Sequence, residues 1–176
     1  MTDFTKIDYL KNGNERQKRA YELLTKRHFF EKLKAYSPIL AGTVPIEIDI
    51  EGSDLDLIFE VDLRFEEDFL DDLMFSRFIP HDVETKVEYP VINGEKCITL
   101  SFMLDEFPIE IFGQNKPTTQ QNAYLLMIAE HKILQEKGEE FKQKIIELKK
   151  QGIKTEPAFG MMLGLENPYE DLLKFK

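Results

Sequence analysis

The chain has 176 residues, which suits one domain or one domain with a helical extension. Hydrophobic residues make up 42% of it and aromatic residues 11%, which excludes a disordered chain, and the apolar runs are too short to span a membrane. The formal net charge of -10 repels phosphate backbones and argues against generic DNA or RNA binding, and the first residues lack the pattern of a secretory signal, so we expect a cytoplasmic protein without a membrane partner.

The first predicted element is an amphipathic helix. Asn14 is a typical N-cap, Gln17 lies three residues later where a capping box needs it, and an apolar stripe continues to Tyr36. The Ser-Pro pair at 37–38 ends this helix. Residues 39–42 read Ile-Leu-Ala-Gly, which is typical of a short buried strand that runs into a turn.

Two further strands are predicted after this turn. Residues 45–50 alternate between apolar and polar with a period of two, and the Gly-Ser pair at 52–53 turns the chain. Residues 54–61 then predict the central strand. Its apolar residues alternate with Asp54 and Asp56, so both carboxylates lie on the face opposite most of the apolar side chains.

The next segments complete a small sheet. We expect a short helix over 65–78, two strands within 83–104 that are joined around Asn93-Gly94, and a strand over 107–112. From about Thr119 onward the apolar spacing becomes helical.

The remaining sequence predicts only helices. Gly152 ends the second long helix, and Pro157 and Pro168 suit the starts of two short closing helices. The predicted fold class is therefore α+β, with a small mixed sheet and its helices in residues 1–116 and a helical C-terminal extension packed on it in residues 117–176.

Three carboxylates form the candidate chemical site. Asp54 and Asp56 are two apart on one strand, so their side chains share a face with α-carbons about 6.5–7 Å apart. Glu110 stands between two isoleucines on a later strand, and it joins the aspartates if the two strands are neighbours. Carboxylates at this spacing can bridge two Mg²⁺ or Mn²⁺ ions in phosphoryl transfer. The alternative is a solvated acidic face, because twelve acidic residues and one basic residue lie between 47 and 72.

The residues around these carboxylates form a recognisable pattern. Gly42-Thr43, a spacer of ten residues and the stretch Asp-Leu-Asp-Leu at 54–57 resemble the signature of the nucleotidyltransferase superfamily, with Ser53 directly before the first aspartate. Glu110 between apolar residues matches the third carboxylate of that signature. Further segments resemble an uncharacterised bacterial domain-of-unknown-function family grouped with the DNA polymerase beta-like, minimal nucleotidyltransferases: 41–45, 52–56, 121–124 and 152–159.

The resemblance implies a role for each matching residue. Asp54 and Asp56 would each bind both metal ions, and Glu110 would bind the catalytic one and help to orient the acceptor. Gly42 and Thr43 would present backbone N–H groups and a hydroxyl to the phosphates of a nucleoside triphosphate.

Ser53 would either add a donor to these phosphates or cap the turn before the strand.

The sequence also departs from the better-known enzymes of this superfamily. They often carry Arg-Gly in the spacer where this chain has Ile46-Glu47, so one cation that would neutralise phosphate is missing. Lys154 is a candidate replacement, or else an ordinary solvated lysine. Glu130 continues an apolar helix stripe, so it is expected to form a structural ion pair or to face the substrate.

Two functions compete at this point. The first is metal-dependent transfer of a nucleoside monophosphate from a triphosphate to an unknown hydroxyl or phosphate acceptor. The second is a catalytically inactive member of the same fold that acts as a binding or regulatory module. The three-carboxylate pattern favours the enzyme, whereas the missing arginine and the crowded acids favour the inactive module.

Overall fold

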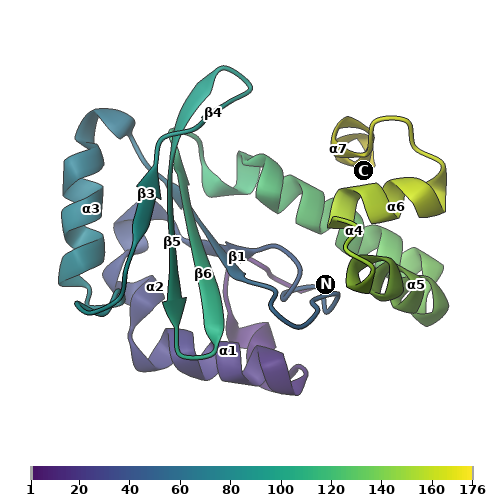
Figure 1. Ribbon diagram of the computed structural model, residues 1–176, viewed down its shortest axis with the longest axis horizontal. Coiled ribbons are helices and arrows are strands. Elements are labelled where there is room, and N and C mark those ends of the chain that lie inside the picture. The colour runs from purple at the N-terminus through teal and green to yellow at the C-terminus, as the bar shows by residue number, and fades with distance from the viewer. Residues whose placement is uncertain (1, 176) are drawn as a thin grey trace.

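The computed structural model describes residues 2–175 and has an α+β fold (Figure 1). A sheet of six strands stands at its centre, with α3 on one side and the C-terminal helices on the other. The helices are α1 (Glu15–Lys26), α2 (Phe29–Lys32), α3 (Glu66–Phe75), α4 (Asn122–Lys137), α5 (Glu139–Lys150), α6 (Thr155–Leu163) and α7 (Pro168–Asp171). The strands are β1 (Ile39–Ala41), β2 (Leu55–Glu60), β3 (Lys86–Glu88), β4 (Val91–Ile92), β5 (Glu95–Leu104) and β6 (Phe107–Gln114).

The sheet has the order β1-β2-β6-β5-β3, and β4 pairs with β5 beside this path. Among the strands of residues 2–175, only β2 and β6 run parallel to each other. The other pairs are antiparallel, so the predicted mixed sheet is confirmed. The hairpin around Asn93-Gly94 is also confirmed, because Ile92 pairs with Glu95 and both turn residues have positive φ, as a two-residue turn of this type requires. Its first arm is interrupted at Pro90, which divides it into β3 and β4.

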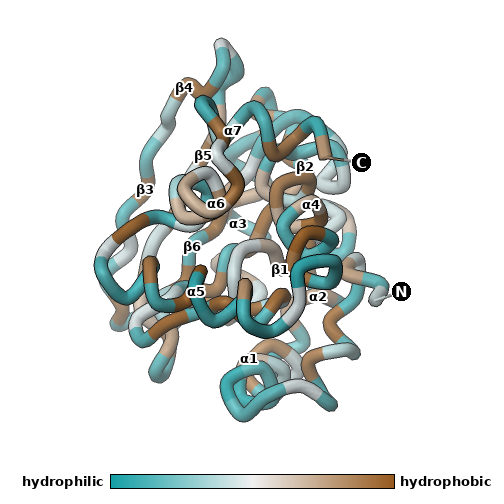
Figure 2. Tube along the Cα trace, turned by 90° about the vertical axis from the view of Figure 1, so that its right-hand side faces the viewer, coloured by the Kyte–Doolittle hydropathy of each residue, from teal (hydrophilic) through white to brown (hydrophobic). Residues whose placement is uncertain are grey.

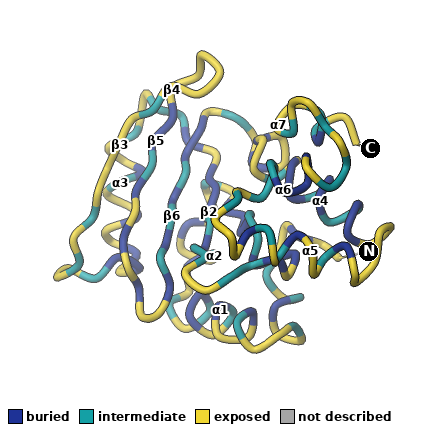
Figure 3. Tube along the Cα trace, turned by 45° about the vertical axis from the view of Figure 1, so that its right-hand side comes forward, coloured by how far each residue is buried: buried dark blue, intermediate teal, exposed yellow. Residues whose placement is uncertain are grey.

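Two apolar cores cover the two faces of the sheet. The first core joins α1 and α3 to the face that carries Leu55, Leu57 and Ile109. The second core joins α4, α5 and α6 to β1 and to Ile58 on the opposite face. Buried residues follow the inner strands and the inward sides of the helices, whereas the arm formed by β3 and β4 is exposed (Figure 3). Figure 2 shows hydrophobic residues (brown) interspersed with hydrophilic residues (teal) along the chain.

The predicted single helix from Asn14 to Tyr36 was wrong in its length. Asn14 and Gln17 do form the reciprocal capping box, but α1 ends at Lys26. His28 adopts a left-handed conformation with φ 52°, and the chain restarts as α2 and a 3-10 turn. The apolar stripe continues across this break because Phe29 is buried in the same core as α1.

The predicted strand over 45–50 was also wrong. These residues form a turn in which Glu47 has φ 60° and the Ile48 amide donates to the Thr43 carbonyl at 3.2 Å. Alternation arises because Ile46 and Ile48 are both buried in the second core while Glu47 points outward. A turn that buries Ile46 and Ile48 on either side of an exposed residue thus imitates the period of a strand.

The helical second half is confirmed. The segment after Pro117 begins with a 3-10 turn, then α4, α5, α6 and α7 follow, with Gly152 just beyond α5 and Pro168 opening α7. Pro157 lies in the first turn of α6, which begins at Thr155. Within residues 2–175 no helix combines the length and apolarity that crossing a bilayer requires.

Candidate active site

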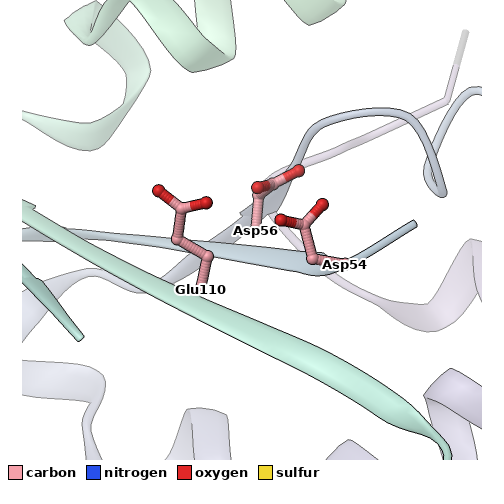
Figure 4. Close-up of side chains that lie close together, drawn as sticks. All are labelled: Asp54, Asp56 and Glu110. Atoms are coloured by element: carbon pink, nitrogen blue, oxygen red, sulfur yellow. The ribbon is translucent and has the colours of Figure 1, made fainter. Parts of the chain in front are cut away.

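The three carboxylates lie together at one end of the parallel strand pair. Asp54 directly precedes β2, Asp56 is the second residue of β2, and Glu110 pairs with Asp56 across the β2–β6 ladder. One carboxylate oxygen from each residue lies within 4.8 Å of the other two (Figure 4). The strand register therefore places on one face the residues that the sequence separates by more than fifty positions.

The carboxylates lie at an end of the sheet that the second core does not cover, which explains why acids are tolerated here. Farther along the same face, Ile58 is buried under the C-terminal helices and Phe112 packs against the same core. Asp54, Asp56 and Glu110 come before this cover begins and are only partly buried. The second core thus ends where the carboxylates begin.

The carboxylates lack cations close enough to neutralise them. Burial, followed by the charges of Asp54 and Glu110, holds the pKa of Asp56 well above its usual range. Burial and the neighbouring Asp54 also raise the pKa of Glu110. In the described chain no ion pair within 4.0 Å involves any of the three. This excess of negative charge suits a divalent cation, since hard oxygen ligands are what Mg²⁺ prefers.

Gly42 lies next to the side chain of Asp56. A Cβ atom at position 42 would stand 1.8 Å from Asp56 Oδ2, and the backbone there has φ 78°. Both facts require glycine at this position in the present geometry. Thr43 follows it in the same turn, and its carbonyl oxygen accepts a hydrogen bond from the Ile48 amide.

Ser53 makes the turn-capping contact that was one of its two expected roles. Its hydroxyl accepts a hydrogen bond from the Ile50 amide at 2.9 Å, and its amide donates back to the Ile50 carbonyl at 3.0 Å. This closes the turn that delivers Asp54 to the strand.

Residues 42–53, which we call the motif loop, are held by α1. Arg16 donates to the Ser53 carbonyl group, and its Nε lies 3.3 Å from Asp49 Oδ2. Gln17, besides closing the helix cap, donates to the Val44 carbonyl at 2.9 Å. Arg16 was not predicted from the sequence, because an arginine beside a capping residue at the start of an amphipathic helix carries no distinctive signal.

Helix α5 holds the same loop from the other side. Lys149 is 7% exposed and donates to the Ile48 carbonyl at 2.7 Å, and Lys142 Nζ lies 2.6 Å from Glu47 Oε2. Burial lowers the pKa of Lys149, while the charges of Glu130, Asp49 and Asp56 favour its ammonium form. Lys149 is therefore the lysine whose charge acts on Asp56. The sequence does not single out Lys149, because a lysine in the last turn of a helix is an ordinary feature.

The other two candidates lie in different surroundings. Glu130 is 4% exposed in α4, and burial followed by the charge of Glu156 raises its pKa well above the usual range. Lys154 is an exposed residue directly before α6. The buried lysine of this region is Lys149, five positions earlier.

A cavity of about 490 Å³ opens beside the carboxylates, and Asp54 and Glu110 form part of its wall. The rest of the wall comes from β5, the start of β6 and residues 83–84. Asp54 and Glu110 are thus accessible from a space that can hold a small molecule, whereas Asp56 does not line it.

Comparison with known proteins assigns the fold and the family. Three solved structures share the fold with low sequence identity. The GLD-2/RNP-8 complex has a TM-score of 0.54 at 12% identity, with 89% of this chain and 61% of that chain covered. The Cid1 poly(U) polymerase bound to Mg 3′-dATP has a TM-score of 0.53 at 14% identity, with coverages of 94% and 52%. The polymerase core of TRAMP, an RNA surveillance complex, has a TM-score of 0.52 at 11% identity, with coverages of 94% and 50%.

This chain therefore has the nucleotidyltransferase fold and spans between half and about three fifths of these solved chains. None of the curated proteins matches it. The sequence model of the family described as domain of unknown function DUF4269 matches residues 22–175, and the chain belongs to this family.

Proposed function

We propose that this member of the family is a metal-dependent nucleotidyltransferase that moves a nucleoside monophosphate from a triphosphate to an acceptor. The convergence of Asp54, Asp56 and Glu110 within 4.8 Å is the observation that supports it most strongly. Nothing in the packing of the sheet requires three acids at adjacent positions, and the raised pKa values of Asp56 and Glu110 indicate a charge that the fold alone leaves uncompensated.

The carboxylates lie close enough together to share metal ions. Mg²⁺ binds oxygen at about 2.0–2.1 Å, so two oxygen ligands of one ion stand at most about 4.2 Å apart. Oxygens that all lie within 4.8 Å of one another suit one such ion or two ions that share Asp54 and Asp56, and we propose two because phosphoryl transfer commonly uses a pair. Bound there, the ions would polarise the reacting phosphate and stabilise the charge of the departing pyrophosphate.

The protein's own residues orient the nucleotide in this proposal. Gly42 and Thr43 offer backbone donors at the turn beside Asp56, where the missing side chain of glycine permits a close approach. Arg16 fixes the end of the motif loop through the Ser53 carbonyl group, and Lys149 fixes its middle through the Ile48 carbonyl group. A loop held at both points keeps the phosphate donors in register with the carboxylates.

The test is binding and transfer with matched variants. We expect Mg²⁺ together with a nucleoside triphosphate to raise the melting temperature of the native protein, and crystals soaked with Mg²⁺ and each of the four nucleoside triphosphates to reveal which base is accepted. Asp56→Asn should abolish both effects, whereas Asp71→Asn, on an exposed part of α3, should retain them. Nucleotide binding without any transfer of label would favour an inactive binding or regulatory module.

A further inference from the structure

The cavity beside the carboxylates has a wall of unusual composition. Its charged residues are all acidic, namely Asp54, Glu84 and Glu110, and no lysine, arginine or histidine of residues 2–175 lines it. Its apolar side chains include Met103, which is 52% exposed on the open face of β5. A long apolar side chain exposed next to reactive carboxylates is available for contact with a ligand.

The nearest lysine along the chain does not alter this composition. Lys86 lies two residues after Glu84 and pairs in register with Ser101, which is part of the wall. Its ammonium group, however, lies 2.9 Å from Glu88 Oε1 and does not belong to the lining. The positive charge nearest in sequence is thus already paired with another residue.

Resting on the nucleotidyl transfer proposed above, we propose that this cavity receives the acceptor, a small hydroxyl compound with an apolar body and a protonated amine. The volume of about 490 Å³ lies within the range of small-molecule sites. The apolar body would contact Met103 and Val83, and the amine would lie toward Glu84. The hydroxyl would reach the end of the cavity that Asp54 and Glu110 form.

Bound metal and nucleotide do not reverse the sign of this charge. Two divalent cations and one triphosphate carry nearly equal and opposite charges, so together they leave the negative charge of the carboxylates in place. An acceptor with its own phosphates would meet that charge without a cationic partner, whereas a polynucleotide is normally held by lysine and arginine side chains. An ammonium group gains from the same field.

The transfer step balances without a further reactant. The acceptor hydroxyl oxygen forms a bond to the α-phosphorus, the bond from that phosphorus to the bridging oxygen breaks, and pyrophosphate leaves. The hydroxyl proton is released to solvent. The amine keeps its proton because its role is to position the acceptor, and it is not the nucleophile.

Three compounds with the same phenyl ring and the same benzylic hydroxyl test the preference for charge. They are 2-amino-1-phenylethanol, 1-phenylethane-1,2-diol and mandelate. The carbon next to the benzylic carbon carries an ammonium group in the first, carries a hydroxyl group in the second and is itself the carboxylate carbon in the third. Binding is followed through the methionine methyl signals of the isotopically labelled full chain, with Met103 assigned by Met103→Leu. We expect the Met103 signal to shift with the amine at about tenfold lower concentration than with mandelate, and the diol to lie between them. Equal affinities, a preference for mandelate or no response of Met103 to any compound would overturn the proposal.

A matched pair of variants locates the charge that is responsible. Glu84→Gln should reduce the preference for the amine over the diol by about two- to fivefold, the range for an exposed charge pair. Asp105→Asn removes the same charge from the exposed β5–β6 turn, outside the cavity, and should leave the preference unchanged. An unchanged preference in Glu84→Gln would contradict the assigned position of the amine.

A transfer assay separates this proposal from the one on which it rests. The native protein is incubated with Mg²⁺, α-labelled nucleoside triphosphates, the three phenyl compounds and a short RNA with a free 3′-hydroxyl. Label on the amino alcohol supports both proposals, and label on RNA alone overturns the acceptor assignment while upholding nucleotidyl transfer. If no label moves although Met103 responds selectively to the amine, nucleotidyl transfer fails and the cavity remains a site for cationic hydroxyl compounds.

Discussion

At the scale of single residues, the closest constraint in the site is between Gly42 and Asp56. Two requirements coincide there, a positive φ and the absence of a Cβ atom next to the carboxylate. The chain contains a natural control, since Gly52 in the same loop has φ 83° but no atom within 4 Å of the place that a Cβ would occupy.

We therefore expect Gly42→Ala to destabilise the protein more than Gly52→Ala. Gly52→Ala should cost about 1–2 kcal/mol, the strain of a left-handed alanine. Gly42→Ala adds the displacement of Asp56 and should also weaken Mg²⁺ binding. Denaturant unfolding measures the first effect and calorimetric titration the second. Equal destabilisation by the two variants, with Mg²⁺ binding intact, would show that Asp56 moves aside without consequence.

The aspartate pair makes a second prediction at this scale. Asp54→Asn/Asp56→Asn removes the buried charge and the repulsion that together raise the pKa of Asp56, and it also deletes the proposed metal site. The double variant should be more stable than the native protein in EDTA. Mg²⁺ at a hundred times its dissociation constant should stabilise the native protein by about 2.7 kcal/mol and leave the variant unchanged. A variant that is less stable in EDTA would instead indicate that the fold satisfies both aspartates.

Glu130 gives a prediction about pH. Its folded-state pKa is raised well above 4.5, so the folded protein holds this proton more tightly than the unfolded chain. Its contribution to stability is therefore complete below about pH 4.5 and is lost as the pH rises toward the folded pKa. Glu130→Gln should have the same melting temperature as the native protein in acid and a higher melting temperature at pH 8. Lower stability at pH 8 would mean that Glu130 is ionised and held by Lys149.

At the scale of elements, the motif loop connects helices that lie far apart in the chain. Helix α1 holds it through Arg16 and Gln17, and helix α5 holds it through Lys142 and Lys149. The loop lacks regular structure, so these contacts replace the ladder of hydrogen bonds that a strand would have supplied.

Lys149→Met tests the contact from α5. It removes a buried hydrogen bond and the cation that acts on Asp56, and we expect a loss of about 1–3 kcal/mol in EDTA. Mg²⁺ should recover more of the stability in this variant than it adds to the native protein, because it replaces the missing positive charge. The control is Lys150→Met, at the exposed neighbouring position. If both variants melt like the native protein, Lys149 does not stabilise the loop.

At the scale of the whole molecule, the second core is shared between residues 1–116 and the helical residues 117–176. The second core contains Ile39, Ile46 and Ile58 from the first segment together with residues of α4, α5 and α6. Each isoleucine that becomes exposed when these helices are removed loses about 1.5–3 kcal/mol of stabilising free energy from burial.

The full chain should consequently unfold in one cooperative transition. Calorimetry should give equal calorimetric and van't Hoff enthalpies, and a fragment of residues 1–116 should bind a hydrophobic dye and aggregate. Two resolved transitions, or a fragment that stays monomeric and folded, would favour two independent domains.

The sequence by itself determined the features that depend on neighbours along the chain. The capping box of Asn14 and Gln17, the Asn93-Gly94 hairpin and the common face of Asp54 and Asp56 all follow from spacing within a few residues. The pairing of β2 with β6 was the condition under which Glu110 would join the aspartates, and the structure contains that pairing.

Only the tertiary structure decided how distant segments meet. Lys149 and Ile48 are 101 positions apart, and Arg16 and Ser53 are 37 apart, so no local pattern records either contact. The same reason explains the wrong strand over 45–50, because Ile46 and Ile48 are buried in the second core on either side of the exposed Glu47, which has the period of a strand without its geometry. The acidic cavity beside Glu110 likewise exists only because residues 83–84 pack near β5 and β6 in the folded chain.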